Sequence, residues 1–197
     1  MAPIPDASAL VLVEGVSDKV ALETLVARRG HDLQAEGVAV VAIGGAQALG
    51  TVLRDLGAQR LDVRLAGLCD VGEERGFRRA LERAGLGSNL TRKGMEGLGF
   101  YVCDPDLEGE LIRVLGAAGV EAVLDTGGSL TSFRTFQKQP QWRDRPPEAQ
   151  LRRFFGSSAG KIKYARLLVE ALDLTSVPRP LDGVLAHVLG SDSGRVA

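Results

Sequence analysis

Acidic side chains stand where two apolar segments of this chain end. Residues 10–13 are apolar and run into Glu14, Asp18 follows four residues later, and residues 65–69 run into Asp70. Acids at the carboxyl ends of parallel strands lie at the edge where open α/β sheets bind ligands. If the two strands are neighbours, their ends lie roughly 5 Å apart. Carboxylates that close repel one another unless a hard cation such as Mg²⁺ lies between them, so Glu14, Asp18 and Asp70 predict a metal site, and phosphate chemistry with it.

Further acids follow the same kind of segment. Glu73 comes shortly after Asp70, and Asp106 and Glu108 come after the apolar residues 100–103. Each has a simpler interpretation, because Glu73 can begin the next helix and the other two suit the first turn of a helix. We retain all three as candidate metal ligands.

A glycine-rich segment precedes Lys161. Residues 156–161 read Gly-Ser-Ser-Ala-Gly-Lys, which departs from a Walker phosphate loop because three residues, not four, separate the glycines. Ile162 also stands where that loop needs a hydroxyl. A lysine at a helix N-terminus still suits an anion; the alternative is an ordinary exposed lysine.

Basic side chains are concentrated between residues 134 and 166. This segment holds nine basic residues and two acidic ones, a net charge of +7 in a chain whose total is -1. Lysine and arginine neutralise phosphates, and aromatic rings such as Trp142, Phe154 and Phe155 can stack on bases. For the two phenylalanines, the favoured interpretation is that they pack the segment onto the body. The predicted nucleic-acid contacts are Arg143, Arg145, Arg152, Arg153, Lys163 and Arg166.

Strand and helix patterns alternate along the first two thirds of the chain. This alternation is typical of a parallel sheet with right-handed crossovers, hence of the α/β class. We expect a core domain over residues 8–125 and a basic helical extension over 126–197 that packs on it. Predicted strands cover 10–14, 37–43, 61–69 and 100–103, and predicted helices cover 17–29 (Ser17 as N-cap), 46–56, 73–84 and 106–116.

Composition sets further bounds. A chain of 197 residues with net charge -1 fits one domain and excludes a uniformly basic nucleic-acid binder. Cys69 and Cys103 lack a CxxC partner and are predicted to be buried, reduced thiols. The first residues lack the pattern of a signal peptide, and no apolar run approaches the roughly 20 residues of a membrane helix. We therefore expect a cytoplasmic protein without a signal peptide that does not bind membranes.

The ordered set of motifs resembles a Toprim domain, in the form found in overcoming-lysogenization-defect (OLD) family nucleases. The resemblance covers residues 8–170 and implies a Rossmann-like fold with a four-stranded parallel sheet and one or two Mg²⁺ or Mn²⁺ ions. By position it assigns metal binding to Glu14, Asp18, Asp70 and Glu108, and catalysis to Glu14 and Lys161. The activity it implies is metal-dependent cleavage of nucleic acid, with DNA favoured.

Two departures leave questions open. The Toprim pattern expects an aspartate two residues after Asp70, where this chain has Gly72, so Glu73 substitutes or one metal is lost. OLD proteins carry an ATPase domain ahead of Toprim, which leaves open a separate ATPase partner, and a homo-oligomer is also open. The alternatives are another Toprim activity (primer synthesis, strand passage or RNA maturation) and a non-catalytic module that binds nucleic acid or a partner. A nucleotide-binding Rossmann domain is disfavoured because no GxGxxG follows the first strand.

Overall fold

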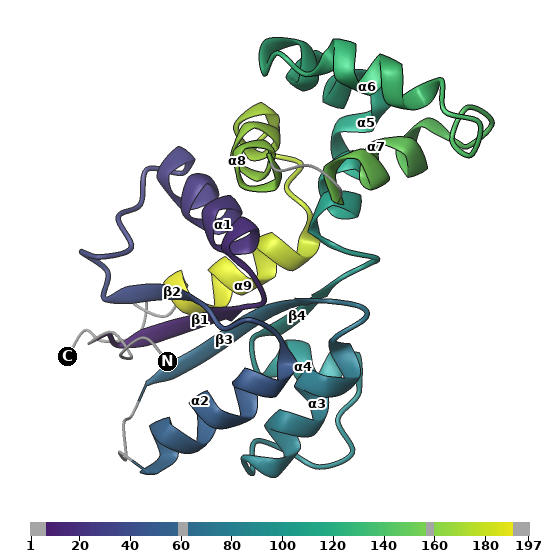
Figure 1. Ribbon diagram of the computed structural model, residues 1–197. Helices are drawn as coiled ribbons and strands as arrows, with labels where there is room; N and C mark the ends of the chain where they lie inside the picture. The colour runs from purple at the N-terminus through teal and green to yellow at the C-terminus, as the bar shows by residue number, and fades with distance from the viewer. Residues whose placement is uncertain (1–6, 59–62, 157–159, 191–197) are drawn as a thin grey trace.

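A four-stranded parallel sheet lies at the centre of the molecule (Figure 1). The computed structural model describes residues 7–58, 63–156 and 160–190. The strands β1 (Ala9–Val13), β2 (Val38–Ala42), β3 (Arg64–Asp70) and β4 (Phe100–Cys103) run in the order β2-β1-β3-β4. The predicted parallel sheet is confirmed. The first and third strands are neighbours, with Val13 opposite Leu68 and Asp70 opposite Cys103 in the next strand.

One face of the sheet is covered by α2 (Ala46–Ala58), α3 (Glu74–Arg83) and α4 (Arg92–Gly97). Alternation along β1 sends Leu10 and Leu12 to this face, where they join the fully buried Phe77 and Phe100. Helix α4 was not predicted from the sequence. It begins at Thr91, whose hydroxyl accepts the Gly94 N–H at 3.1 Å, an N-cap that is visible only as a single threonine in the chain.

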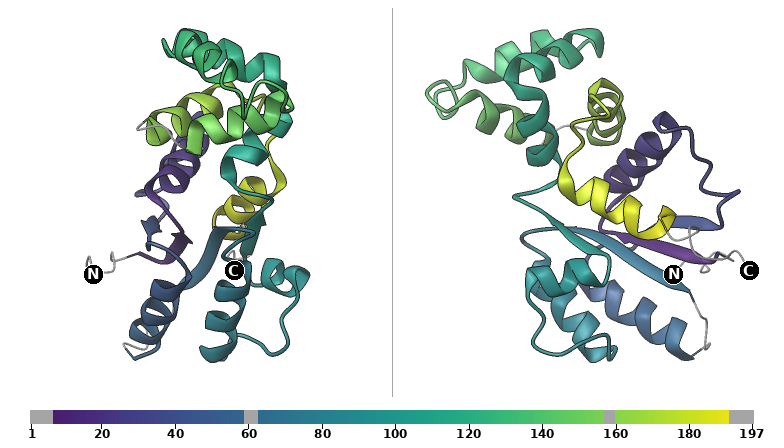
Figure 2. Two further views of the ribbon diagram at one scale, coloured as in Figure 1. Left: turned by 45° about the vertical axis from the view of Figure 1, so that its right-hand side comes forward. Right: turned by 180° about the vertical axis from the view of Figure 1, so that it is seen from behind.

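The opposite face is covered by α1 (Val16–Arg28) and α9 (Arg179–Leu189), and α8 (Lys161–Ala171) packs on the outer side of α1, as Figure 2 also shows. Arg28 of α1 donates to the carbonyls of Val169 and Leu172 at 2.7 and 2.8 Å. Arg64 of β3 donates to the carbonyl of Val188 in α9 at 2.8 Å. The last two helices of the chain therefore complete the same core as the first strand.

Helices α5 (Leu107–Thr126), α6 (Leu130–Gln137) and α7 (Pro147–Gly156) form a lobe that projects from the sheet (Figures 1 and 2). We call residues 117–156 the helical lobe. Helix α5 is interrupted at Gly116 (φ 68°, ψ 163°), where the predicted helix ends. The predicted domain boundary at residue 125 falls in the last turn of α5. Within the lobe, rings pack on one another: Phe133, Phe136, Phe154 and Phe155.

In the described part of the chain, the helices are all too short or too polar to cross a lipid bilayer.

Candidate active site

The loop between β1 and α1 positions the first two acids. Gly15 is the N-cap and α1 begins at Val16, so the prediction that Ser17 is the N-cap is wrong. Asp18 takes the capping role instead, because its Oδ2 accepts the Gly15 N–H at 2.8 Å. A Cβ on residue 15 would lie 3.3 Å from that oxygen, so glycine lets the chain pass close to the carboxylate. Asp18 is buried and Glu14 is half-buried beside it.

Asp70 meets Glu14 at the carboxyl edge of the sheet. The Asp70 N–H lies 3.4 Å from Glu14 Oε2, and this contact joins the ends of β3 and β1. The proximity that was expected from neighbouring strands is thus present in the backbone and side-chain geometry.

Glu108 and Lys161 come to the same edge from two different helices. Glu108 lies in the first turn of α5 and its side chain is 8% exposed, and Lys161 is the first residue of α8. Glu108 Oε1 is 3.2 Å from Lys161 Nζ. It is buried and has no well-aligned hydrogen-bond donor in the described part of the chain. The charge of Glu108 is thus balanced by the ammonium of Lys161, although this oxygen has room for a further ligand.

These groups share one electrostatic environment. Burial, and then the charges of Glu14 and Asp18, raise the pKa of Asp70 to about 7. Burial also raises the pKa of Asp18 to about 6, against the opposing effects of the Gly15 N–H and Lys161. Burial lowers the pKa of Lys161, but Glu108 outweighs it and the pKa is raised overall, so this lysine is charged at neutral pH. The site holds more negative charge than one lysine balances.

Glu73 and Asp106 have structural partners. Glu73 Oε2 accepts the Ala46 N–H at 3.0 Å and so caps α2. Asp106 Oδ1 accepts the Gly109 N–H at 2.8 Å, as the N-cap of α5, and Asp106 Oδ2 lies 2.6 Å from Arg152 Nε. The alternative interpretation of Asp106 as a capping residue is confirmed, while metal binding by these two acids stays a prediction.

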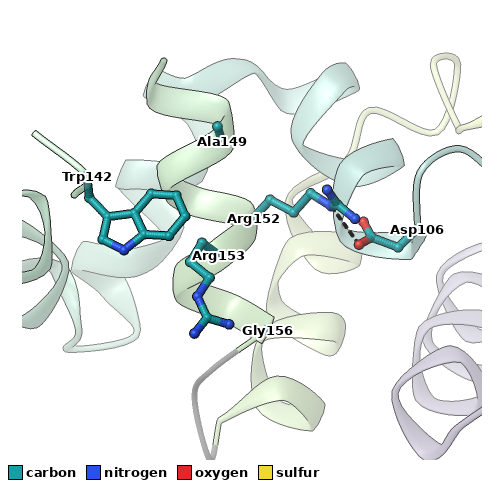
Figure 3. A pocket seen from close by; sticks show the side chains of 6 residues that line it. All are labelled: Asp106, Trp142, Ala149, Arg152, Arg153 and Gly156. Atoms are coloured by element: carbon teal, nitrogen blue, oxygen red, sulfur yellow. Dashed lines mark hydrogen bonds and ion pairs between the residues drawn. The ribbon is translucent and has the colours of Figure 1, made fainter. Parts of the chain in front are cut away.

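The predicted nucleic-acid contacts lie in several local environments, and their role stays a prediction. Arg152 and Arg153 line a cavity of about 350 Å³ with Asp106 and Trp142 (Figure 3). Elsewhere, Arg143 pairs with Asp144 at 3.2 Å, Arg166 pairs with Glu170 at 3.1 Å, Lys163 donates to the Gly127 carbonyl at 2.7 Å, and Arg145 is exposed in the turn before α7.

Trp142 is absent from the predicted contacts and yet lines this cavity. Its ring stacks on Phe136, with centroids 5.4 Å apart and planes at 28°. The buried Gln150 donates to the Trp142 carbonyl at 2.7 Å and fixes the backbone. The sequence shows a single tryptophan among arginines. It does not show that the residue borders this cavity, because the direction of the ring depends on the fold.

The donor set suits a hard divalent ion in its chemistry. Glu14, Asp18, Asp70 and Glu108 offer only carboxylate oxygens, the ligands that Mg²⁺ and Mn²⁺ prefer. The pKa values of Asp18 and Asp70 are raised by burial and by neighbouring carboxylates, a concentration of negative charge that a divalent ion would stabilise. Within residues 7–58, 63–156 and 160–190, no three such side chains are already gathered around one point as a metal would require.

Comparison with known proteins agrees with the resemblance. Residues 7–71 match the family model described as "Overcoming lysogenization defect protein-like, TOPRIM domain". The fold is similar to the C-terminal region of the Burkholderia pseudomallei OLD protein (TM-score 0.69, 17% identity, covering 92% of this chain and 97% of that one). It is equally similar to the C-terminal region of the Xanthomonas campestris pv. campestris OLD protein (TM-score 0.70, 20% identity, 94% and 96% covered). Among curated proteins, no sequence matches.

The expected α/β fold and the Toprim resemblance are therefore confirmed. The sequence match includes Glu14, Asp18 and Asp70 and ends before Glu108 and Lys161. The helices that carry those two residues are covered by the structural comparison alone. At 17–20% identity, that comparison shows a shared fold and nothing about the role of either residue.

Proposed function

We propose that this protein is a metal-dependent nuclease that hydrolyses phosphodiester bonds in nucleic acid, DNA in the first place. The observation that carries the proposal is the meeting of Glu14, Asp70 and Glu108 with Lys161 at the carboxyl edge of the sheet. These groups come from two strand ends and two helix starts.

The carboxylates of Glu14, Asp18, Asp70 and Glu108 would hold Mg²⁺ or Mn²⁺. When bound, such an ion activates a water molecule and offsets the negative charge of the phosphate. Gly15 positions Asp18, since its N–H is the hydrogen-bond donor to that carboxylate. The Asp70 N–H holds Glu14 in the same way.

Lys161 supplies the fixed positive charge of the site. Its Nζ is held beside Glu108 at the N-terminal end of α8, where the helix dipole also favours an anion. A phosphate that gains negative charge in the transition state is stabilised by such a preorganised cation. Because its pKa is raised, Lys161 acts as this cation and not as a base at neutral pH.

Nicking of supercoiled plasmid with Mg²⁺ or Mn²⁺ tests the proposal. We expect cleavage by the wild type and a loss of at least 100-fold in Glu14→Ala and Lys161→Ala, since one transition-state contact is worth about that factor. Glu23→Ala is the matched control. Glu23 lies in α1, the helix that follows Glu14, and it pairs with Lys19 at 2.9 Å and not with the candidate active site. Full cleavage by a folded Glu14→Ala protein would refute the assignment.

A second candidate function is a module that binds nucleic acid without cutting it. Gly72 in place of the expected aspartate favours this alternative, as does the lack of a preformed group of three ligands in the described residues. Calorimetric titration with Mn²⁺ separates the two. If the protein is a nuclease, the wild type binds Mn²⁺ and the Glu14→Ala variant does not. If it is a non-catalytic module, neither the wild type nor the variant shows site-specific binding.

A further inference from the structure

The cavity beside Arg152 combines an aromatic ring with two arginines and an acid. Trp142 lies on one side of it and Asp106 on the other, and Arg152 reaches across from α7 to Asp106 (Figure 3). Asp106 is the N-cap of α5 and Glu108 lies in the first turn of the same helix. The cavity therefore ends two residues along the chain from an acid of the candidate active site.

The charges in the cavity suit a phosphate. Arg153 is exposed and forms no ion pair with any described residue. Arg152 uses only Nε to contact Asp106 in the described contacts, so its other N–H groups are free to donate. Arginine binds phosphate oxygens through two parallel N–H donors.

The ring of Trp142 suits an unpaired base. One face is covered by Phe136, and the residue borders the cavity. A volume of about 350 Å³ is at the small end of ligand pockets. Bases within a duplex already stack on their neighbours, so only a single-stranded or extruded base can present its face to such a ring.

There is room for a nucleic-acid backbone on both sides of Arg152. A second hollow of about 260 Å³ shares Ala149 and Arg152 with the first and is also lined by Gly109 and Arg113. Arg152 therefore lies between two hollows along α7. An arginine that contacts the phosphate backbone midway along an extended single strand of nucleic acid would lie in such a position.

We infer that this cavity holds an unpaired nucleotide of the substrate, with its base on Trp142 and its phosphate between Arg152 and Arg153. The inference rests on the proposed function and narrows it, because it makes single-stranded or locally unpaired nucleic acid the preferred substrate over intact duplex.

The sole tryptophan makes the test direct. The chain contains one Trp, so its intrinsic fluorescence reports on this cavity alone. In EDTA, which prevents metal-dependent cleavage, we expect saturable quenching by a thymidine oligonucleotide and little quenching by a blunt duplex of equal length. Equal quenching by both would overturn the preference for unpaired bases, and binding of the labelled oligonucleotide without quenching would place the nucleic acid elsewhere.

Variants separate stacking from charge. By anisotropy of a labelled oligonucleotide, we expect Trp142→Ala to bind about 5- to 100-fold more weakly, the factor that loss of one stacked base brings. Trp142→Phe, which retains a ring, should restore part of this. Arg153→Ala should reduce the slope of log affinity against log salt by about 0.7, the value for one phosphate contact on a single strand. Arg79→Ala, an exposed arginine on α3 across the sheet, is the matched control and should bind as the wild type does. Unchanged binding in both Trp142→Ala and Arg153→Ala overturns the inference.

The two proposals fail in different ways. If Trp142→Ala nicks plasmid as the wild type does and binds the oligonucleotide normally, the nuclease stands and the cavity inference falls. If quenching by single strands is found but no metal supports cleavage, the cavity inference stands and the nuclease falls.

Discussion

Asp70, at the end of β3, destabilises the folded protein when its carboxylate is ionised. The pKa of Asp70 is raised to about 7, chiefly by burial and next by the charge of Glu14. The folded protein therefore binds the Asp70 proton more tightly than the unfolded chain does. As pH rises from about 4 to above 7, the carboxylate ionises and stability falls, because the unfolded state loses that proton at lower pH.

Asp70→Asn removes this cost. In metal-free buffer at pH 8, we expect the melting temperature to rise by about 2 °C or more, the equivalent of 1 kcal/mol for a chain of this size. The gain should disappear toward pH 4, where the wild-type carboxyl is protonated. Thermal unfolding followed by circular dichroism measures both, with Asp125→Asn, an exposed acid of α5, as the control. A gain that is independent of pH would contradict the electrostatic explanation.

Gly72 lies where the Toprim pattern places a second aspartate, and the space for that side chain exists. A Cβ at this exposed position meets no atom within 4 Å. We expect Gly72→Asp to fold normally and to bind Mn²⁺ on the order of tenfold more tightly, since affinity rises with the number of carboxylate ligands. Gly57→Asp adds the same charge on α2, where a Cβ also meets nothing. Equal affinities in calorimetry for the two variants would show that residue 72 lies outside the metal site.

Among the elements, α5 depends on a backbone state that only glycine adopts easily. Gly116, at φ 68° and ψ 163°, turns the helix between its first turns, which carry Glu108, and the part that enters the helical lobe. This region of backbone space costs other residues about 1–3 kcal/mol. Gly116→Ala should lower the free energy of unfolding by that amount in urea denaturation. Gly119→Ala should be neutral or stabilising by up to about 1 kcal/mol, because Gly119 is regular helix and a Cβ there lies 3.5 Å from Leu115. The same effect at both positions would mean that helix propensity, not the turn, decides.

The elements also show where sequence reasoning succeeds. The apolar strands and the acids after them could be predicted because each is a local pattern: β1 and β3 end within one residue of Glu14 and Asp70. Glu73 could not be assigned in this way, since its contact is with Ala46, the first residue of α2. The partner of Asp106 is likewise 46 residues away, at Arg152. Such pairings depend on how the helices pack, which cannot be predicted from the spacing of residues along the chain.

At the scale of the whole molecule, the sheet separates two cores, and the end of the chain closes one of them. Leu168 of α8 and Leu181 and Leu185 of α9 are fully buried against the layer that contains α1. A fragment of residues 1–125 would leave that apolar face uncovered. We expect the fragment to show no cooperative thermal transition by circular dichroism, in contrast to the full chain. A sharp transition near that of the full chain would show that residues 8–125 fold as an independent domain.

Charge is also divided at this scale. The segment 134–166 has a net charge of +7, and the rest of the chain therefore carries -8. The Arg152–Asp106 ion pair joins the two parts beside the acids. We expect this basic segment to attract a nucleic acid and to hold it next to a body that would repel it without a cation.

The two native cysteines lie directly behind the acids, on neighbouring strands and out of contact with solvent. Burial raises the pKa of both Cys69 and Cys103, and the surrounding carboxylates raise it further. Because the thiolate is the form that reacts with maleimides and disulfide reagents, the wild-type chain is in effect already a cysteine-free background for labelling. A dye or spin probe attached to one cysteine introduced on α7 would follow the helical lobe in solution while the native thiols stay silent.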